Sequence, residues 1–273
     1  MGTESFREFE HEGWGKQSVA QVYHEHLSRV TTGVIPDLLD AGGVKRGDKV
    51  LDVACGAGYV AAAASERGAD ATGVDFSLVQ VLLARQTYPN IRFVEGDAEA
   101  LDFSDGAFDV VLNAFGMPHV PNPDKAVAEA FRVLRRGGRF AYASWSDPEK
   151  CIGFSMVYDA IRAHGTLDVG LPPGPNFFSY GDPGYARDLL GRAGFADVTA
   201  KEAPLLWRVS NPDAIIETFL NGSVRASAVL RLQSPDNFAK IKEYLRDRIS
   251  KFKQNGGYAV PSPALVVSGR RSG

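Results

Sequence analysis

The stretch VLDVACGAGYVA, residues 50–61, decides the fold of this chain. It begins with aliphatic residues typical of a buried strand, passes through a turn with two glycines, and continues as a helix from near Gly58. A glycine after a strand lets the bare backbone approach a ligand, because it has no Cβ. The free N–H groups of the first helical turn point to the same place. The stretch therefore predicts a nucleotide-type cofactor site, although the spacing Gly-x-Gly-x-x-Ala is shared by unrelated cofactor folds.

Asp52 narrows the choice between those folds, since it stands at the end of the strand and beside the turn. In an NAD(P) enzyme a pyrophosphate lies over this turn, where the positive end of the helix favours it. A carboxylate in that position repels a diphosphate but attracts a cation. S-adenosylmethionine carries an ammonium group, a sulfonium and no phosphate. Asp52 therefore favours this cofactor and leaves an NAD(P)-dependent oxidoreductase as the alternative.

Polar residues follow three further predicted strands, and they are Asp75, Asp97 and Asn113. Ligands of open α/β sheets bind at the carboxyl ends of the strands, so these side chains are expected to gather at one edge. An acid after the second strand accepts hydrogen bonds from ribose hydroxyls in dinucleotide sites. We expect Asp75 to do the same here, and Asp97 to accept a hydrogen bond from an adenine amino group.

Four motifs follow one another between residues 47 and 145, namely VLDVACGAG, GVDFS, VEGDAEALDFSDGAFDVV and LRRGGRF. In their order and spacing the chain resembles class I S-adenosylmethionine-dependent methyltransferases. The resemblance is strongest to the small-molecule branch that includes ubiquinone and menaquinone C-methyltransferases. That family usually has glycine where this chain has Ala54, a substitution that leaves the resemblance intact. The resemblance implies a methyltransferase that uses S-adenosylmethionine and acts on a small molecule, largely apolar or aromatic, at oxygen, nitrogen or carbon.

The resemblance also implies the cofactor site. It places Asp52 near the methionine amino group, two glycines beneath the cofactor, and Asp75 on the ribose. In the family, N-terminal helices close the site, which makes Trp14 and Tyr23 candidates for its walls, with plain packing as the alternative. The expected cofactor-binding residues are Asp52, Ala54, Gly56, Gly58, Asp75, Phe76, Asp97, Ala98, Asn113 and Tyr23.

His119 is the catalytic candidate, because it follows the fourth strand where the methyl group is expected to emerge. A hydroxyl or carbon-acid acceptor needs a base, and histidine is suited to that role near neutral pH. Members of the resembled branch often carry histidine here, in some of them as the base. A structural role for His119 in its loop is the alternative. The expected substrate-lining residues imply a mainly apolar acceptor, although core packing also explains several of them: Trp14, Phe115, Met117, Trp145, Phe177 and Phe178.

The order of predicted elements gives an α/β fold. Strands alternating with helices imply a Rossmann-like, doubly wound, mostly parallel seven-stranded sheet. Its last strand resembles the antiparallel edge strand of the family, and additional helices form a helical lid. The strands are expected near residues 50–53, 70–74, 91–95, 108–112, 138–144, 196–204 and 264–269.

We expect one methyltransferase domain over residues 1–273, divided into a lid, a core and a cap. The divisions are an N-terminal helical lid at 14–42, a cofactor-binding core at 43–146, cap insertions at 150–182 and 211–256, and the end of the core sheet at 183–210 and 257–273.

Composition and charge set limits on the function. Hydrophobic content of 44% and charged content of 23% are those of an ordinary globular protein. A net charge of -3 gives no case for nucleic acid, and two cysteines indicate neither a disulfide framework nor a metal cluster. No apolar run is long enough for a membrane span, and the start lacks a signal peptide, so a cytoplasmic protein is expected.

The sequence leaves several points open. A role in secondary metabolism is the expectation for the pathway, and a homodimer is the assembly to test. A protein that binds S-adenosylmethionine without transferring its methyl group is a further alternative.

Overall fold

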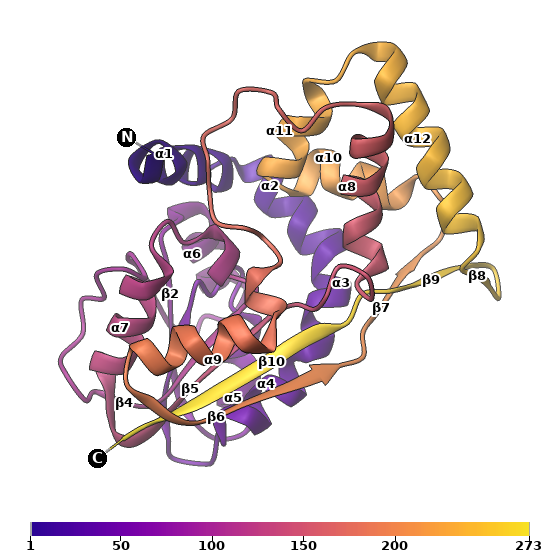
Figure 1. Ribbon diagram of the computed structural model, residues 1–273. Helices are drawn as coiled ribbons and strands as arrows, with labels where there is room; N and C mark the ends of the chain where they lie inside the picture. The colour runs from indigo at the N-terminus through magenta and orange to yellow at the C-terminus, as the bar shows by residue number, and fades with distance from the viewer. Residues whose placement is uncertain (1, 273) are drawn as a thin grey trace.

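The computed structural model describes residues 2–272, in which strands and helices alternate through the core (Figure 1). The helices are α1 (Gly2–Trp14), α2 (Gln17–Val22), α3 (Ser28–Thr31), α4 (Ile35–Gly42), α5 (Tyr59–Glu66), α6 (Leu78–Thr87), α7 (Pro123–Val133), α8 (Ile152–His164), α9 (Pro183–Arg192), α10 (Ala214–Gly222), α11 (Arg225–Arg231) and α12 (Pro235–Ser250). A π-helical turn (Tyr23–Leu27) joins α2 to α3, and short 3₁₀ turns lie at Thr32–Val34, Met117–His119 and Ser179–Gly181.

The strands form two sheets. The larger has seven strands in the order β3-β2-β1-β4-β5-β10-β6, and β10 runs antiparallel to both of its neighbours. This confirms the predicted Rossmann-like, mostly parallel sheet. The antiparallel last strand is not at the edge, because β6 lies outside it. The strands are β1 (Lys49–Val53), β2 (Asp70–Asp75), β3 (Arg92–Glu95), β4 (Phe108–Ala114), β5 (Leu134–Trp145), β6 (Phe195–Ala203), β7 (Leu206–Val209), β8 (Lys253–Gln254), β9 (Gly257–Pro261) and β10 (Ala264–Arg271).

Alternate residues of each strand bury their side chains on opposite faces of the sheet. On β4, Val110 and Leu112 pack on the face covered by α4, whereas Val111 belongs to the second cluster, on the other face with α7 and α9. Both faces are thus covered, which explains why the strands are apolar nearly throughout.

Helices α8, α10, α11 and α12 form a cap beside the sheet, in the upper right of Figure 1. The long helix α12 packs on α8, and α10 packs on α2. Part of the cap is a second sheet of three strands in the order β7-β9-β8. Within residues 2–272, every helix is too short or too polar to span a bilayer.

The boundaries predicted for the end of the core sheet, 183–210 and 257–273, are too wide. Strands β7 and β9 fall inside those ranges but belong to the second sheet. The antiparallel pair of β6 and β10 leaves the core sheet at Pro204 and Pro263, and its continuation pairs Leu206 with Pro261. Proline has no N–H to donate to a strand ladder, so the main sheet ends there.

The lid predicted at 14–42 also needs correction at both ends. Helix α1 precedes it and packs on α2, so the covering segment begins before Trp14. At the other end, α4 packs against β4, β5 and β10 and therefore belongs to the core. The lid proper consists of α1, α2 and α3.

Gly58 allows a close contact between α5 and the sheet. Its φ is +87°, and a Cβ at this position would lie 2.6 Å from Phe93 Cζ. We expect Gly58→Ala to lower the free energy of unfolding by about 1–3 kcal/mol, through overpacking and left-handed strain. The control is Gly191→Ala in α9, where nothing lies within 4 Å of the added Cβ. Denaturant unfolding of both variants tests this, and an unchanged Gly58→Ala protein contradicts the packing argument.

Candidate active site

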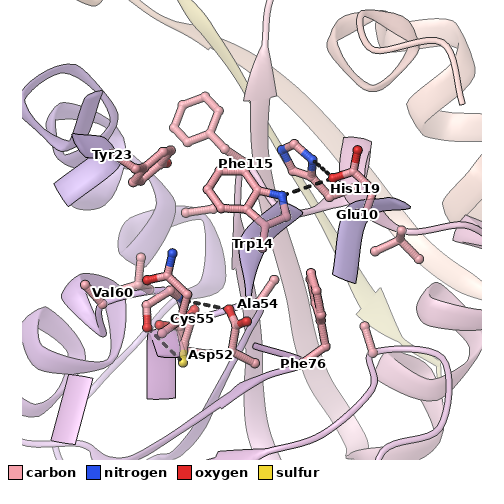
Figure 2. Close-up of a pocket in the computed structure, with 18 of the residues that line it drawn as sticks. Glu10, Trp14, Tyr23, Asp52, Ala54, Cys55, Val60, Phe76, Phe115 and His119 are labelled. Carbon is pink, nitrogen blue, oxygen red and sulfur yellow. Dashed lines mark hydrogen bonds and ion pairs between the residues drawn. The ribbon is translucent and has the colours of Figure 1, made fainter. Parts of the chain in front are cut away.

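A pocket with a volume of ≈ 430 Å³ opens at the carboxyl ends of β1, β2 and β4, and α1 supplies one of its walls (Figure 2). Strands β1 and β4 are neighbours in the sheet although far apart in the sequence, so the pocket lies where the strand order reverses. Predicted residues in its walls are Trp14, Tyr23, Asp52, Ala54, Gly56, Asp75, Phe76, Asp97, Ala98, Phe115 and His119.

Asp52 is 1% exposed and presents a carboxylate oxygen that lacks a partner. The Ala61 N–H donates to Asp52 Oδ2 at 3.1 Å, whereas Oδ1 has no hydrogen bond. Burial raises the pKa of Asp52 to about 8, a rise that the Ala61 hydrogen bond opposes and the charge of Asp75 reinforces. An unpaired buried carboxylate is costly, and a cationic ligand bound beside it would relieve that cost.

Asp75 holds the glycine-containing turn in place. The Gly56 N–H donates to its Oδ2 at 2.8 Å, and the Ser77 N–H donates to its Oδ1 at 2.9 Å. Burial raises the pKa of Asp75 to about 6, against these two hydrogen bonds and the nearby His119, which lower it. Each carboxylate oxygen has a second lone pair, so Asp75 retains capacity to accept from a ligand hydroxyl.

The ionisable groups that line the pocket are mainly acidic. Among the described residues in its walls, Arg7 is the one lysine or arginine, and its guanidinium is engaged. It donates to Asp97 Oδ2, and to Glu99 Oε2 at 2.6 Å. No lysine or arginine therefore remains free among the described wall residues to bind a pyrophosphate. With the unpaired oxygen of Asp52, this charge pattern fits S-adenosylmethionine. The acidic wall residues are Glu10, Asp52, Asp75, Glu95 and Asp97.

Two non-glycine residues with positive φ shape the walls after β1 and β4. Ala54 has φ +55° and Phe115 has φ +59°, a region that residues with side chains rarely adopt. A Cβ on Gly116 would lie 2.5 Å from both the Ala54 Cβ and Asn113 Nδ2, so only glycine fits between them. The positive φ of Ala54 is the physical reason why glycine suits this position in the resembled family.

His119 is tied to the N-terminal helix. Its Nδ1 lies 2.8 Å from Glu10 Oε2, which also accepts a hydrogen bond from Trp14 Nε1 at 3.0 Å (Figure 2). The Trp14 ring packs edge-on against the imidazole, with centroids 5.2 Å apart. Among the described residues, the hydrogen-bond partner of the His119 ring is this carboxylate and not a backbone group.

Two predicted cofactor-binding residues do not line the pocket. Gly58 faces Phe93, as described above. Asn113 shapes the loop after β4, because its Nδ2 donates to the Val53 carbonyl and its Oδ1 accepts from the Gly116 and Met117 N–H groups. Both residues therefore support the walls from behind. A position next to the motif does not by itself place a residue in the pocket.

Four predicted substrate-lining residues also lie outside the walls. Met117 is buried in the cluster on the opposite face of the sheet. Trp145 packs between Phe115 and Phe154, with ring centroids at 4.2 and 3.7 Å. Phe177 packs edge-on against His119 at 6.4 Å, and Phe178 packs against Phe177. These aromatic rings form a layer of core behind Phe115 and His119, so apolar packing outweighs exposure to the pocket.

Sequence reasoning predicted Trp14 but missed three other wall residues that α1 contributes, Arg7, Glu10 and His11. The buried side chains of α1 include Phe6, Glu10 and Trp14, four residues apart on one helical face. That spacing is a signal for an amphipathic helix, but the acidic residue in the middle of the stripe obscures it. Elsewhere in the walls, Tyr59 and Gln80 were not predicted either.

We expect Asp75→Ala to weaken S-adenosylmethionine binding by about 2–3 kcal/mol, the scale of charge-assisted hydrogen bonds lost at a buried site. The same change leaves the Gly56 and Ser77 N–H groups without their acceptor. Isothermal calorimetry measures the affinity. The matched control is Asp70→Ala, at the exposed opposite end of β2. Unchanged affinity in Asp75→Ala would remove Asp75 from the site.

Comparisons with known proteins connect this geometry to a family. A model described as a methyltransferase domain matches residues 51–142. A demethylmenaquinone methyltransferase of Paenarthrobacter aurescens is 32% identical over 226 residues, or 77% of this chain and 82% of the relative. A ubiquinone/menaquinone biosynthesis C-methyltransferase of Serratia proteamaculans is 33% identical over 59% of this chain and 71% of the relative. For a demethylmenaquinone methyltransferase of Renibacterium salmoninarum, 40% identical, the match spans about half of the relative, 47%.

Solved structures show the same fold. A putative methyltransferase from Bacillus halodurans matches with a TM-score of 0.57 and 22% identity, covering 88% of this chain and 99% of that one. An N-methyltransferase of Haemonchus contortus, solved with S-adenosylhomocysteine, matches with a TM-score of 0.58 and 16% identity, covering 98% of this chain and 60% of that one. Together with the alignment over most of the Paenarthrobacter relative, these findings establish that the chain belongs to the S-adenosylmethionine-dependent methyltransferases.

Proposed function

We propose that the protein transfers the methyl group of S-adenosylmethionine to a small acceptor that is mainly apolar or aromatic. The observation that carries the proposal is the buried, unpaired Oδ1 of Asp52 in an acid-lined pocket. A cationic ligand group would stabilise this oxygen. S-adenosylmethionine has an ammonium group for it, whereas NAD(P) would place its anionic pyrophosphate over the same turn. The family assignment excludes the alternative of an NAD(P)-dependent oxidoreductase.

The proposed cofactor contacts follow from the pocket walls. Asp52 would hold the methionine amino group, and Asp75 the ribose hydroxyls. Bound there, S-adenosylmethionine supplies a methyl group on a positively charged sulfur. At the adenine end, Ala98 and Asp97 line the wall. The Asp97 carboxylate already accepts hydrogen bonds from Arg7 and from the Glu99 N–H, and we propose that it also accepts one from the adenine amino group.

The proposed acceptor site lies beside His119. The surfaces near it come from Trp14, Phe115 and Tyr23, which present aromatic rings to the pocket (Figure 2). Two of the relatives above are named for demethylmenaquinone, whose ring is aromatic in its reduced form. The protein therefore needs to orient a flat, apolar molecule and exclude water from it, and His119 lies beside the three rings and is suited to accept a proton.

Calorimetry and product analysis test this proposal. We expect S-adenosylmethionine and S-adenosylhomocysteine to bind, and NAD⁺ and NADP⁺ not to bind. A panel of a naphthohydroquinone, a phenol and an aromatic amine is then incubated with the cofactor, and S-adenosylhomocysteine is measured. Methylation of any of these supports the proposal. Binding of the cofactor with no product from every acceptor class would favour a protein that uses the cofactor without methyl transfer.

The cytoplasmic location, the role in secondary metabolism and the homodimer stay predictions. Fractionation of cells tests the first, and light scattering of the purified protein tests the third. Identification of the methyl acceptor tests the predicted role in secondary metabolism.

A further inference from the structure

Glu10 is a buried carboxylate that the proposed function does not use. It is 3% exposed, although it stands on a helix at the surface of the molecule. Its Oε2 lies between two ring nitrogens, Trp14 Nε1 at 3.0 Å and His119 Nδ1 at 2.8 Å. The one arginine in the pocket walls, Arg7, is bound to Asp97 and Glu99 instead. The Trp14 indole can only donate to Oε2, whereas the His119 imidazole donates to it only when Nδ1 carries a proton.

The contact with Glu10 bears on which nitrogen of His119 carries the proton. An ionised carboxylate is an acceptor only, so the contact requires a proton on Nδ1. In the neutral ring Nε2 then carries the lone pair, and among residues 5–272, whose side chains the structure describes, nothing hydrogen-bonds to it. The Trp14 and Phe177 rings and the Asp75 carboxylate also lie near His119. On the other side, the charge of Glu10 contributes to the raised pKa of Tyr158.

We propose that Glu10 is a positioning residue that fixes His119 in the tautomer with Nε2 free, so that Nε2 takes a proton from a hydroxyl or carbon-acid acceptor. This inference rests on the proposed function and names its acceptor class. Such acceptors include phenols, hydroquinones and enols, whose nucleophilic form appears only when a proton leaves. An amine acceptor needs no such base, because its neutral nitrogen already carries a lone pair.

One proton passes from the acceptor through His119 to water. It leaves the acceptor O–H or C–H for Nε2, and the electron pair of that bond becomes available to the acceptor atom. The imidazole becomes an imidazolium with Nδ1–H still directed at Glu10, which remains ionised and stabilises the positive ring. The imidazolium then releases the Nε2 proton to water, which restores the starting state.

The tautomer is measured directly by ¹⁵N NMR of the full-length protein labelled at histidine. The His119 signals are those lost in the spectrum of His119→Asn. We expect a protonated Nδ1 and an unprotonated Nε2 in the wild type, and a mixture of tautomers in Glu10→Gln, whose amide presents either an oxygen or an NH₂ group. A wild-type spectrum with the proton on Nε2 would overturn the inference, whether or not any acceptor is methylated.

Kinetics of Glu10→Gln provide the second test, with a phenol or hydroquinone that the wild type methylates. This variant keeps the shape of Glu10 and an oxygen for Trp14, so a purely structural role predicts an unchanged kcat. We expect kcat to fall by at least about tenfold with the KM for the acceptor nearly unchanged, because the lost charge no longer stabilises the imidazolium. The control is Glu8→Gln, an exposed position on the same helix with the same change in charge.

Three outcomes separate this inference from the function on which it rests. If Glu10→Gln retains wild-type kcat, Glu10 has no positioning role, and the methyltransferase activity stands. If aromatic amines are methylated and hydroxyl or carbon acids are not, the assigned acceptor class is wrong. If no acceptor is methylated, the proposed function fails, and the NMR result still decides whether Glu10 sets the tautomer.

Discussion

Asp52→Asn is expected to weaken S-adenosylmethionine binding by about 2–5 kcal/mol, the range for removing one partner of a buried charge pair. The variant keeps the shape of the side chain and an oxygen for the Ala61 N–H, which donates to it at 3.1 Å. It removes only the negative charge. The loss of affinity therefore reports the attraction between the carboxylate and the ammonium group of the ligand.

Calorimetry with three ligands checks this assignment. S-adenosylmethionine and S-adenosylhomocysteine share the amino group and are expected to lose similar affinity, whereas 5′-methylthioadenosine lacks that group and is expected to lose little. The control variant is Asp188→Asn, at an exposed position on α9. Equal losses for all three ligands would show that Asp52 supports the pocket in general and does not bind the amino group.

The same carboxylate gives the ligand-free protein a pH-dependent stability. Burial raises the pKa of Asp52 from 3.8 to about 8 and that of Asp75 from 3.8 to about 6. Between pH 4 and 8 the folded state therefore binds more protons than the unfolded state, so the stabilising contribution is present at low pH and is lost as pH rises. We expect the Tm of wild type to fall over this interval more steeply than that of Asp52→Asn, as measured by thermal scans without ligand. Parallel curves of Tm against pH for the two proteins would contradict the raised pKa of Asp52.

His119→Ala is expected to lower kcat by about 100-fold for a hydroxyl or carbon-acid acceptor, the contribution of a general base. The affinity for S-adenosylhomocysteine is expected to stay close to wild type, because no predicted cofactor contact uses this imidazole. The variant also leaves Glu10 Oε2 with Trp14 as its remaining partner. Steady-state kinetics and calorimetry on the same preparation separate the two effects.

The control for this experiment is His26→Ala, a histidine that is half-exposed on the N-terminal helices. A His119→Ala protein with near-normal turnover and intact folding would leave His119 a structural part of its loop. A protein that loses cofactor affinity as much as turnover would indicate that the wall between α1 and β4 has collapsed, and thermal scans would detect this.

Many of the residues that line the pocket were predictable from the sequence, for a local reason. Asp52 and Gly56 lie on one continuous strand and turn, and Asp75 ends the next strand along the chain. The alternation of strands and helices makes those strands parallel neighbours, and parallel neighbours place their carboxyl ends together. Side-chain type and position along the chain were sufficient there.

The direction of individual side chains was not predictable in the same way. Gly58, Asn113 and Met117 stand as close to the motifs as the residues of the walls do. Gly58 makes room for Phe93, Asn113 binds backbone groups of its own loop, and Met117 enters the opposite core cluster. These choices depend on which face of the sheet each residue reaches and on what packs there, and residues distant in the sequence decide both.

The sequence by itself determined the α/β fold, the carboxylates at the strand ends and the cationic cofactor that they suit, because those follow from the period of the strands and from local chemistry. Only the tertiary structure decided that α1 forms a wall and that Glu10 reaches His119 across 109 positions of the chain. A contact of that kind has no periodic signature. It exists because burying Phe6 and Trp14 docks the helix, and docking brings the carboxylate to the imidazole.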